Sequence, residues 1–85
     1  MSLENLRKEI ESVNICILKL LAKRNNVSKK IGTYKKKHNL SITDKKKEKE
    51  IFAKIKSQSK RLGLHERFVK DVFNKIIKES KRLQR

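Results

Sequence analysis

Proline and tryptophan are both absent from this 85-residue chain. Without proline, no residue obliges a helix to break or kink. The lack of tryptophan and a hydrophobic content of only 35% leave little material for an apolar core. A single copy would therefore be marginal in stability, and chains of this size often gain the missing burial by association.

Cysteine occurs once, as Cys16, which excludes an intrachain disulfide and a cysteine metal cluster. We expect Cys16 to be a small, partly buried hydrophobic residue rather than a reactive thiol. The chain also lacks an apolar run long enough for a membrane span, and its amino terminus lacks a signal-peptide core. These absences predict a soluble, cytoplasmic protein with no membrane partner.

Acidic residues are scarce, since 9 of them stand against 25 basic residues and give a formal net charge of +16. Such a charge raises nucleic acid as a candidate partner, with a small anionic substrate as the alternative. The basic residues are scattered along the whole chain, and no reading helix or aromatic stacking surface is recognisable. This distribution favours a solvated basic surface over a dedicated nucleic-acid interface.

What the sequence does contain is a long helical repeat over its first half. Its members follow one another at steps of three and four: Leu3, Leu6, Ile10, Val13, Ile17, Leu20, Arg24, Val27, Ile31, Tyr34 and His38. This period predicts one helix of roughly 50 Å, whereas a compact chain of this length has a radius of gyration of about 12 Å. We therefore expect a second copy of the chain to pack along the repeat.

Two residues are exceptions within this predicted helix, for which Ser2 is the expected N-cap. Arg24 stands where an apolar residue is due, and a charge there is costly unless something anionic meets it. Either the repeat is frayed at that point, or Arg24 awaits an anionic ligand or a protein carboxylate. Gly32 lowers helix propensity, which suggests the close approach of another backbone or a ligand.

Two shorter helices are predicted after this long one, and no strand alternation, duplicated segment or low-complexity linker is visible. The first is capped by Thr43 or Asp44 and runs to about Leu62, with Gly63 as its stop signal. Its predicted inward face is Asp44, Glu48, Ile51, Phe52 and Ile55. The second runs over residues 65–85, and its predicted buried side is Phe68, Val69, Val72, Phe73, Ile76 and Ile77, continued by Ser80, Leu83 and Gln84. We expect a single all-α domain over residues 1–85, with His38 and His65 in cap or surface roles.

Polar residues interrupt the inward face of all three predicted helices, which suggests a polar pocket enclosed by them. These residues are Arg24, Asp44, Glu48, Ser80 and Gln84. The sequence shows no paired acids at catalytic spacing, no metal-ligand constellation and no glycine-rich phosphate loop. We therefore expect neither a metal nor a cofactor. Fixed cations and hydrogen-bonding groups of this kind can bind an anion and stabilise charge that develops during a rearrangement.

An ordered set of motifs resembles the all-helical class of chorismate mutase over nearly the whole chain. The motifs are Leu6-Arg7-Lys8-Glu9-Ile10, Leu20-Leu21-Ala22-Lys23-Arg24, Lys30-Ile31-Gly32-Thr33-Tyr34-Lys35, Asp44 with Glu48, and Ile76-Ile77-Lys78-Glu79-Ser80 with Gln84. The resemblance implies an isomerase that rearranges chorismate to prephenate, in the shikimate pathway of phenylalanine and tyrosine biosynthesis. It also implies an intertwined homodimer whose long helices span both subunits.

The resemblance further implies a role for each site residue. Arg24, together with Arg7 of the partner subunit, would hold the two substrate carboxylates, because the planar guanidinium matches a carboxylate. Arg7 and Lys35 lie about 42 Å apart on a straight helix, so one substrate can meet both only if an antiparallel partner brings its own Arg7 alongside.

For the remaining residues, the resemblance implies contacts with the reacting part of the substrate. Lys35 and Gln84 would donate hydrogen bonds to the ether oxygen as its carbon–oxygen bond breaks. Asp44 and Glu48 would engage the substrate hydroxyl, and Ser80 would assist at a carboxylate. Arg24, Lys35, Glu48 and Gln84 are thus the predicted catalytic residues.

One departure from the family pattern falls within the predicted site. Lys47 stands where the family often has arginine, which keeps the charge but loses the bidentate fork. Two other functions stay open at this point: an isochorismate pyruvate-lyase of the same fold, and a basic helical dimer that binds nucleic acid. The lyase would differ in its products, and the nucleic-acid binder would show salt-sensitive binding.

Overall fold

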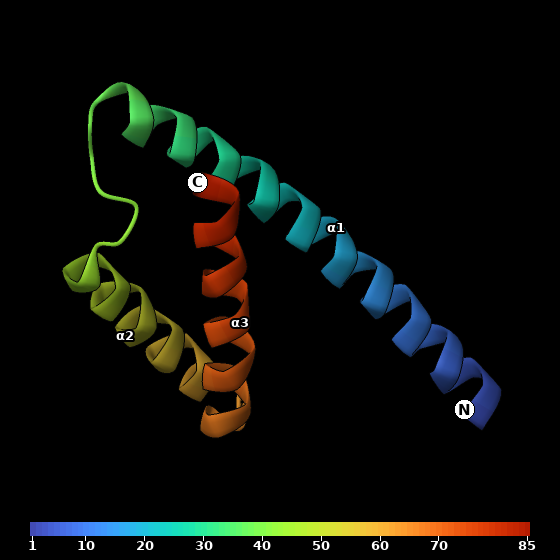
Figure 1. Cartoon of the computed structure of the whole chain (residues 1–85). Helices are drawn as coiled ribbons and strands as arrows, with labels where there is room; N and C mark the ends of the chain where they lie inside the picture. The colour runs from blue at the N-terminus through green and yellow to red at the C-terminus, as the bar shows by residue number, and fades with distance from the viewer.

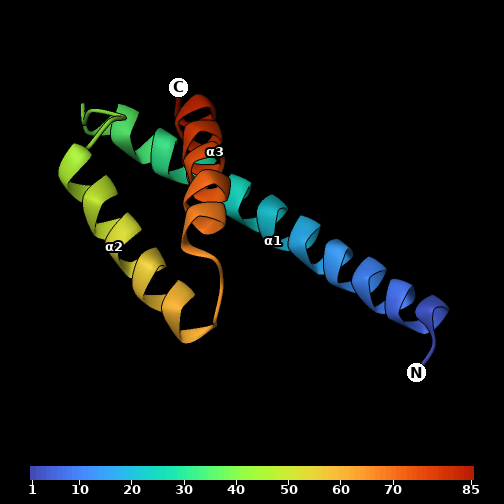
Figure 2. The same cartoon turned by 90° about the horizontal axis from the view of Figure 1, so that it is seen from below.

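The protein consists of three α-helices, α1 (Leu3–Lys37), α2 (Lys45–Arg61) and α3 (Glu66–Gln84), with no strand. The structure is a computed structural model and describes all 85 residues. α3 packs against both α1 and α2. α3 meets α1 in its C-terminal half, α2 contacts α3 and not α1, and the N-terminal half of α1 projects away from both shorter helices (Figures 1 and 2). The predicted all-α fold, with one long and two shorter helices, is confirmed.

The helices begin and end at residues that satisfy the free backbone groups of their terminal turns. Ser2 caps α1 by accepting a hydrogen bond from the Asn5 N–H (3.1 Å), as predicted. Asp44, the second of the two predicted caps, accepts from the Lys47 N–H (3.1 Å) at the start of α2. His38 is the C-cap of α1, and the His65 Nδ1 accepts from the Phe68 N–H (3.3 Å) at the start of α3. Both histidines therefore have the cap roles that were predicted.

Gly63 ends α2 with a positive φ of 68°, a conformation that glycine adopts without steric cost. Its N–H donates to the Lys60 carbonyl (3.2 Å), and the Leu64 N–H donates to the Ser59 carbonyl (3.0 Å). These two bonds form the hydrogen-bond pattern of a Schellman motif. The reversal of direction that brings α3 back along α2 is thus encoded locally.

Gly32 lies where α3 crosses α1. An alanine Cβ at this position would lie 2.6 Å from the Gln84 Cα and 2.7 Å from the Gln84 carbonyl oxygen. The predicted close approach of another backbone is confirmed, and that backbone is the last turn of α3. The Lys36 ammonium donates to the Arg85 carbonyl and fastens the same end. α1 therefore positions the C-terminal turn of α3.

A single copy of the chain has almost no apolar core. Val69 is the only buried hydrophobic residue, and every apolar member of the repeat along α1 is exposed. The radius of gyration is 16.0 Å and the longest extent is 55 Å, against about 12 Å for the radius of a compact chain. A single chain therefore does not cover its own first helix, as was expected.

Two predictions of burial are wrong for the single copy. The predicted partial burial of Cys16, which lies beside the repeat that a second copy would cover, stays a prediction, since Cys16 is exposed in one chain. Phe68 and Val72 were placed on the buried side of α3 but are 62% and 36% exposed. Periodicity identifies the apolar face of a helix, but α1 and α2 together cover only part of that face on α3.

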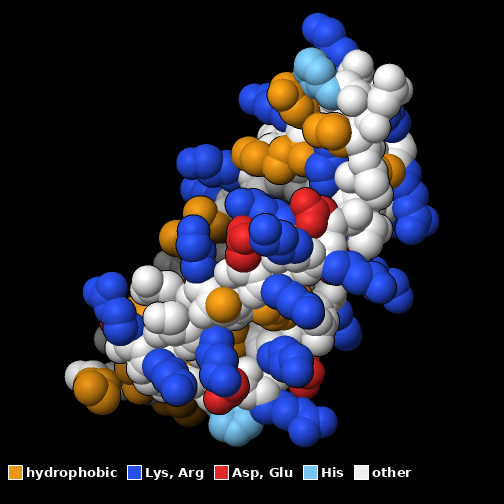
Figure 3. Space-filling model, turned by 90° about the vertical axis from the view of Figure 1, so that its left-hand side faces the viewer, with side chains coloured by type: hydrophobic (Ala, Val, Ile, Leu, Met, Phe, Trp, Pro, Cys, Tyr) orange, Lys and Arg blue, Asp and Glu red, His pale blue; other side chains and the backbone are white.

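The surface is strongly basic. On the face shown in Figure 3, Lys and Arg side chains are spread over all parts of the molecule, with acidic groups standing singly among them. None of the three helices has both the length and the apolar character that crossing a membrane would require.

Candidate functional site

A cavity of about 430 Å³ lies among the C-terminal half of α1, the start of α2 and the last turns of α3. Six of the seven predicted site residues line it: Arg24, Lys35, Asp44, Glu48, Ser80 and Gln84. The seventh, Arg7, lies near the far end of α1 and does not line it. Residues from all three helices therefore meet at one place, although more than 50 positions separate Arg24 from Ser80 in the sequence.

One wall of the cavity is a cluster around Ser80. The Arg24 guanidinium donates a hydrogen bond to the Ser80 hydroxyl oxygen, and the Ser28 hydroxyl donates to the same oxygen (3.1 Å). A serine oxygen has two acceptor lone pairs, and both are now engaged. The Ser80 O–H is left free to donate a hydrogen bond, for example to a carboxylate.

Arg24 is only partly exposed, and this burial lowers the pKa of its guanidinium below the usual value. The group stays protonated in a protein because its pKa starts so high. α1 is continuous through this residue, and the guanidinium contacts Ser80. No protein carboxylate pairs with it, so Arg24 presents a cation that has only a neutral partner.

A second wall is formed by Lys35 and Gln84. The Lys35 ammonium donates to the Gln84 Oε1 (3.1 Å) and to the Ile42 carbonyl (3.0 Å). Because lysine can only donate, this contact fixes the orientation of the Gln84 amide, with its NH₂ group left to donate elsewhere. The ammonium likewise keeps one of its three N–H groups. Two donors are thus available side by side.

The third wall carries the carboxylates. Asp44 caps α2, and the Glu48 carboxylate forms an ion pair with Lys81 of α3, both side chains being about a quarter exposed. Lys47, which also lines the cavity, pairs with Glu50 (3.4 Å), and 68% of its side chain is exposed. The cation that faces Glu48 therefore comes from α3 and not from α2.

Two residues that line this cavity, Ser28 and Lys81, were not predicted from the sequence. Ser28 lies one helical turn after Arg24, and this spacing could have identified it. Lys81 lies between Ser80 and Gln84, but a lysine among many has no distinguishing signal.

The charges of the cavity favour an anionic ligand. Four cationic side chains line it, against the carboxylates of Asp44 and Glu48. No group of three or more His, Cys, Asp or Glu side chains is placed to hold a metal ion. The arrangement can bind a small anion and donate hydrogen bonds to it from several sides.

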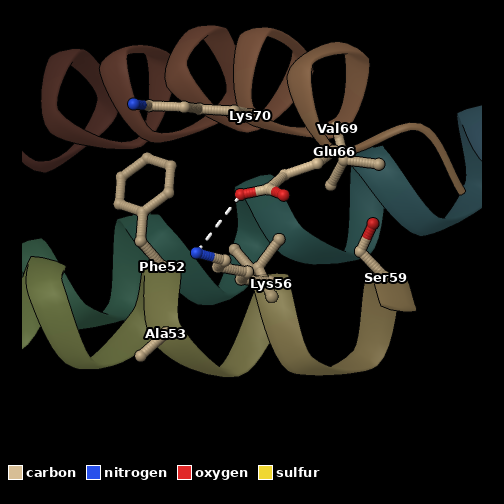
Figure 4. Close-up of a pocket in the computed structure, with 8 residues that line it drawn as sticks. Phe52, Ala53, Lys56, Ser59, Glu66, Val69 and Lys70 are labelled. Atoms are coloured by element: carbon tan, nitrogen blue, oxygen red, sulfur yellow. Dashed lines mark ion pairs between the residues drawn. The ribbon is translucent and has the colours of Figure 1, made fainter. Parts of the chain in front are cut away.

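A second cavity of about 240 Å³ lies between the C-terminal half of α2 and the start of α3 (Figure 4). Lys56 and Glu66 form an ion pair across it (3.3 Å), and both side chains are more than half exposed. The Ser59 hydroxyl is buried there without a hydrogen-bond partner. This cavity holds none of the predicted site residues, so the first cavity is the better candidate.

Comparison with known proteins identifies relatives over nearly the whole chain. Residues 6–85 match the family model described as chorismate mutase type II. The chorismate mutase of Methanocaldococcus jannaschii is 31% identical over 83 residues, which cover 98% of this chain and 84% of that protein. A solved structure, a conserved hypothetical protein from Pyrococcus furiosus, matches with a TM-score of 0.75 at 35% identity and covers 98% of this chain and 95% of its own.

Other relatives are much longer than this chain. The bifunctional chorismate mutase/prephenate dehydratase of Aquifex aeolicus is 47% identical over 53 residues, which are 62% of this chain but 15% of that protein. The bifunctional protein of the same name from Buchnera aphidicola is 35% identical over 79 residues, which are 93% of this chain and 20% of that protein. The similarity is therefore confined to one part of these longer proteins.

Proposed function

The chain belongs to the chorismate mutase type II family of isomerases, and on that premise we propose that it converts chorismate to prephenate in the cavity among its three helices. The observation that supports this proposal is the meeting of Arg24, Lys35, Ser80 and Gln84 around one space. The reaction is an intramolecular rearrangement in which a carbon–oxygen bond breaks and a carbon–carbon bond forms. It needs no proton transfer or co-reactant, so fixed charges and donors suffice.

Arg24 and Ser80 bind one substrate carboxylate in this proposal. The guanidinium has no carboxylate partner within the chain, and the Ser80 O–H is the donor left after both of its lone pairs are used. A bidentate arginine contact also restricts how the substrate can turn. Binding at this end thus holds the substrate in the compact conformation that the rearrangement requires.

Lys35 and Gln84 stabilise the transition state in this proposal by donating to the ether oxygen. Negative charge builds on that oxygen as its bond to carbon breaks. The free N–H of Lys35 and the NH₂ of Gln84 lie beside each other because the two side chains are hydrogen-bonded together (3.1 Å). Donors that are held in place before the charge appears need little reorganisation free energy during the reaction. Glu48 and Asp44 accept from the substrate hydroxyl.

In this proposal, a cation from another chain binds the second substrate carboxylate. Arg7 lies on the same helix as the cavity, but about 42 Å from Lys35 along the helix axis. An antiparallel second copy, packed on the exposed apolar repeat of α1, would bring the partner's Arg7 to the cavity. The active unit that we propose is accordingly an intertwined homodimer with shared sites, acting in phenylalanine and tyrosine biosynthesis.

The direct test is to add chorismate to the purified protein and to identify the product by chromatography, with isochorismate as a parallel substrate. Prephenate from chorismate supports the proposal, whereas salicylate and pyruvate from isochorismate would replace it with the lyase. Arg24→Ala and Gln84→Ala should each lower turnover by roughly 10²-fold or more while helicity is kept. Arg67→Ala and Gln58→Ala, at exposed positions, are the matched controls. Wild-type rates in either site variant would contradict the assignment.

A further inference from the structure

Lys81 forms the least exposed ion pair of the molecule. Its ammonium contacts the Glu48 carboxylate, and the two side chains are 29% and 26% exposed. In each of the other four ion pairs both side chains are at least 44% exposed. Exposed pairs contribute little, and the contribution grows as water is excluded from the pair. The contact between Lys81 and Glu48 is thus the ion pair with most influence on the cavity.

Lys81 is the cation that forms an ion pair with Glu48. Lys47, on the same helix, is paired with Glu50 (3.4 Å), and its side chain is 68% exposed. Lys35 donates to Gln84 and to the Ile42 carbonyl, and Arg24 donates to Ser80. The direct counter-charge of Glu48 therefore comes from α3.

The Glu48 carboxylate by itself would weaken the binding of the proposed ligand. Chorismate carries two negative charges, and an uncompensated Glu48 would repel them both before and during the reaction. An ion pair with Lys81 cancels that repulsion and also restricts the rotamers of the glutamate. The carboxylate can then face the cavity as an acceptor for the substrate hydroxyl without opposing the binding of the dianion.

We propose that Lys81 is a positioning residue that acts through Glu48: it supplies the counter-charge that allows a carboxylate to line a site for a dianion. This inference rests on the proposed function. Because the repulsion acts on bound substrate and transition state alike, its effect falls on KM more than on kcat.

The test compares Lys81→Met with Lys78→Met, which removes the same charge from an exposed position on the same helix. We expect Lys81→Met to raise KM about tenfold with kcat changed less than about threefold, whereas Lys78→Met leaves KM within about twofold. Lys81→Arg, which keeps the charge, should have a KM close to the wild-type value. Equal KM values for Lys81→Met and Lys78→Met would overturn the proposal.

A double-mutant cycle with Glu48→Gln separates an indirect role from a direct one. If Lys81 acts through Glu48, Lys81→Met should change KM less than about twofold when Glu48 is already Gln. An undiminished effect in that background would show that Lys81 binds substrate itself and would overturn the proposal.

The energy of the ion pair can also be measured without turnover, from the thermal unfolding of the wild type, Lys81→Met, Glu48→Gln and the double variant. A coupling between the two substitutions supports the pair, and additive changes in Tm refute it. Absence of chorismate turnover in the wild type would refute the proposed function, and this outcome is distinct from either result of the cycle.

Discussion

Replacing Gly32 by alanine should displace the last turn of α3 and disable the cavity without unfolding the helices. The added Cβ would lie 2.6, 2.7 and 3.0 Å from the Cα, carbonyl oxygen and carbonyl carbon of Gln84. All three are backbone atoms, so no change of side-chain rotamer can relieve the overlap. Restoring ordinary contact distances requires the turn to move by about 1 Å.

A shift of this size changes the contact between Lys35 and Gln84. The Lys35 ammonium and the Gln84 Oε1 are 3.1 Å apart, and about 1 Å more would break their hydrogen bond. The Gln84 amide would lose its fixed orientation and its place beside Lys35. Misplacing a catalytic group by about 1 Å can cost roughly 10²-fold in rate, and we expect a loss of kcat of that order.

The effect on stability should be much smaller than the effect on rate. Alanine gains about 1 kcal/mol of helix propensity over glycine, while overpacking costs about 1–3 kcal/mol. The free energy of unfolding should therefore fall by no more than about 2 kcal/mol. Circular dichroism and a denaturant titration measure this, alongside steady-state kinetics with chorismate.

Gly63→Ala is the matched control, because nothing lies within 4 Å of a Cβ there. Its φ of 68° makes alanine strained, so this variant should lose about 1 kcal/mol of stability and keep its kcat. The reasoning is refuted if Gly32→Ala retains wild-type kcat, or if Gly63→Ala loses as much activity as Gly32→Ala.

Three further outcomes are expected. Arg7→Ala and Arg24→Ala should each be nearly inactive alone, and mixing them after unfolding and refolding should recover about a quarter of the wild-type activity, because one site in each mixed dimer has both arginines. No recovery would contradict a shared site. The net charge of +16 should speed capture of a dianion, so kcat/KM should fall as salt rises, and a salt-independent value would remove that idea. Ser59→Ala should raise the free energy of unfolding by about 1 kcal/mol in a denaturant titration, because it removes a buried hydroxyl without a partner, and a loss of stability would indicate a hidden partner.

Local features of the structure were predictable because they depend on residues close together in the chain. The caps at Ser2 and Asp44 and the stop at Gly63 follow from side-chain chemistry within one turn. The length of α1 follows from an unbroken period of apolar residues without proline. The position of Arg24 in that period predicted a polar pocket, and Arg24 lines a cavity in the structure.

Contacts between helices were predictable only in part. The apolar side of α3 was identified, but Phe68 and Val72 on that side are exposed. The periodicity of a helix states which face is apolar and carries no information on what covers it. The same limit applies to Cys16, which no other helix of its own chain covers.

The three helices, their ends and the polar residues on their inward faces could be read from the sequence, because a period of 3.6 and a capping side chain act over a few residues. Three contacts could not be read from it: the ion pair of Glu48 with Lys81, the hydrogen bond of Ser28 to Ser80, and the approach of the Gln84 backbone to Gly32. Each of these contacts depends on the crossing of two helices. The position and angle of a crossing are set by the packing of whole faces, which no single stretch of sequence contains.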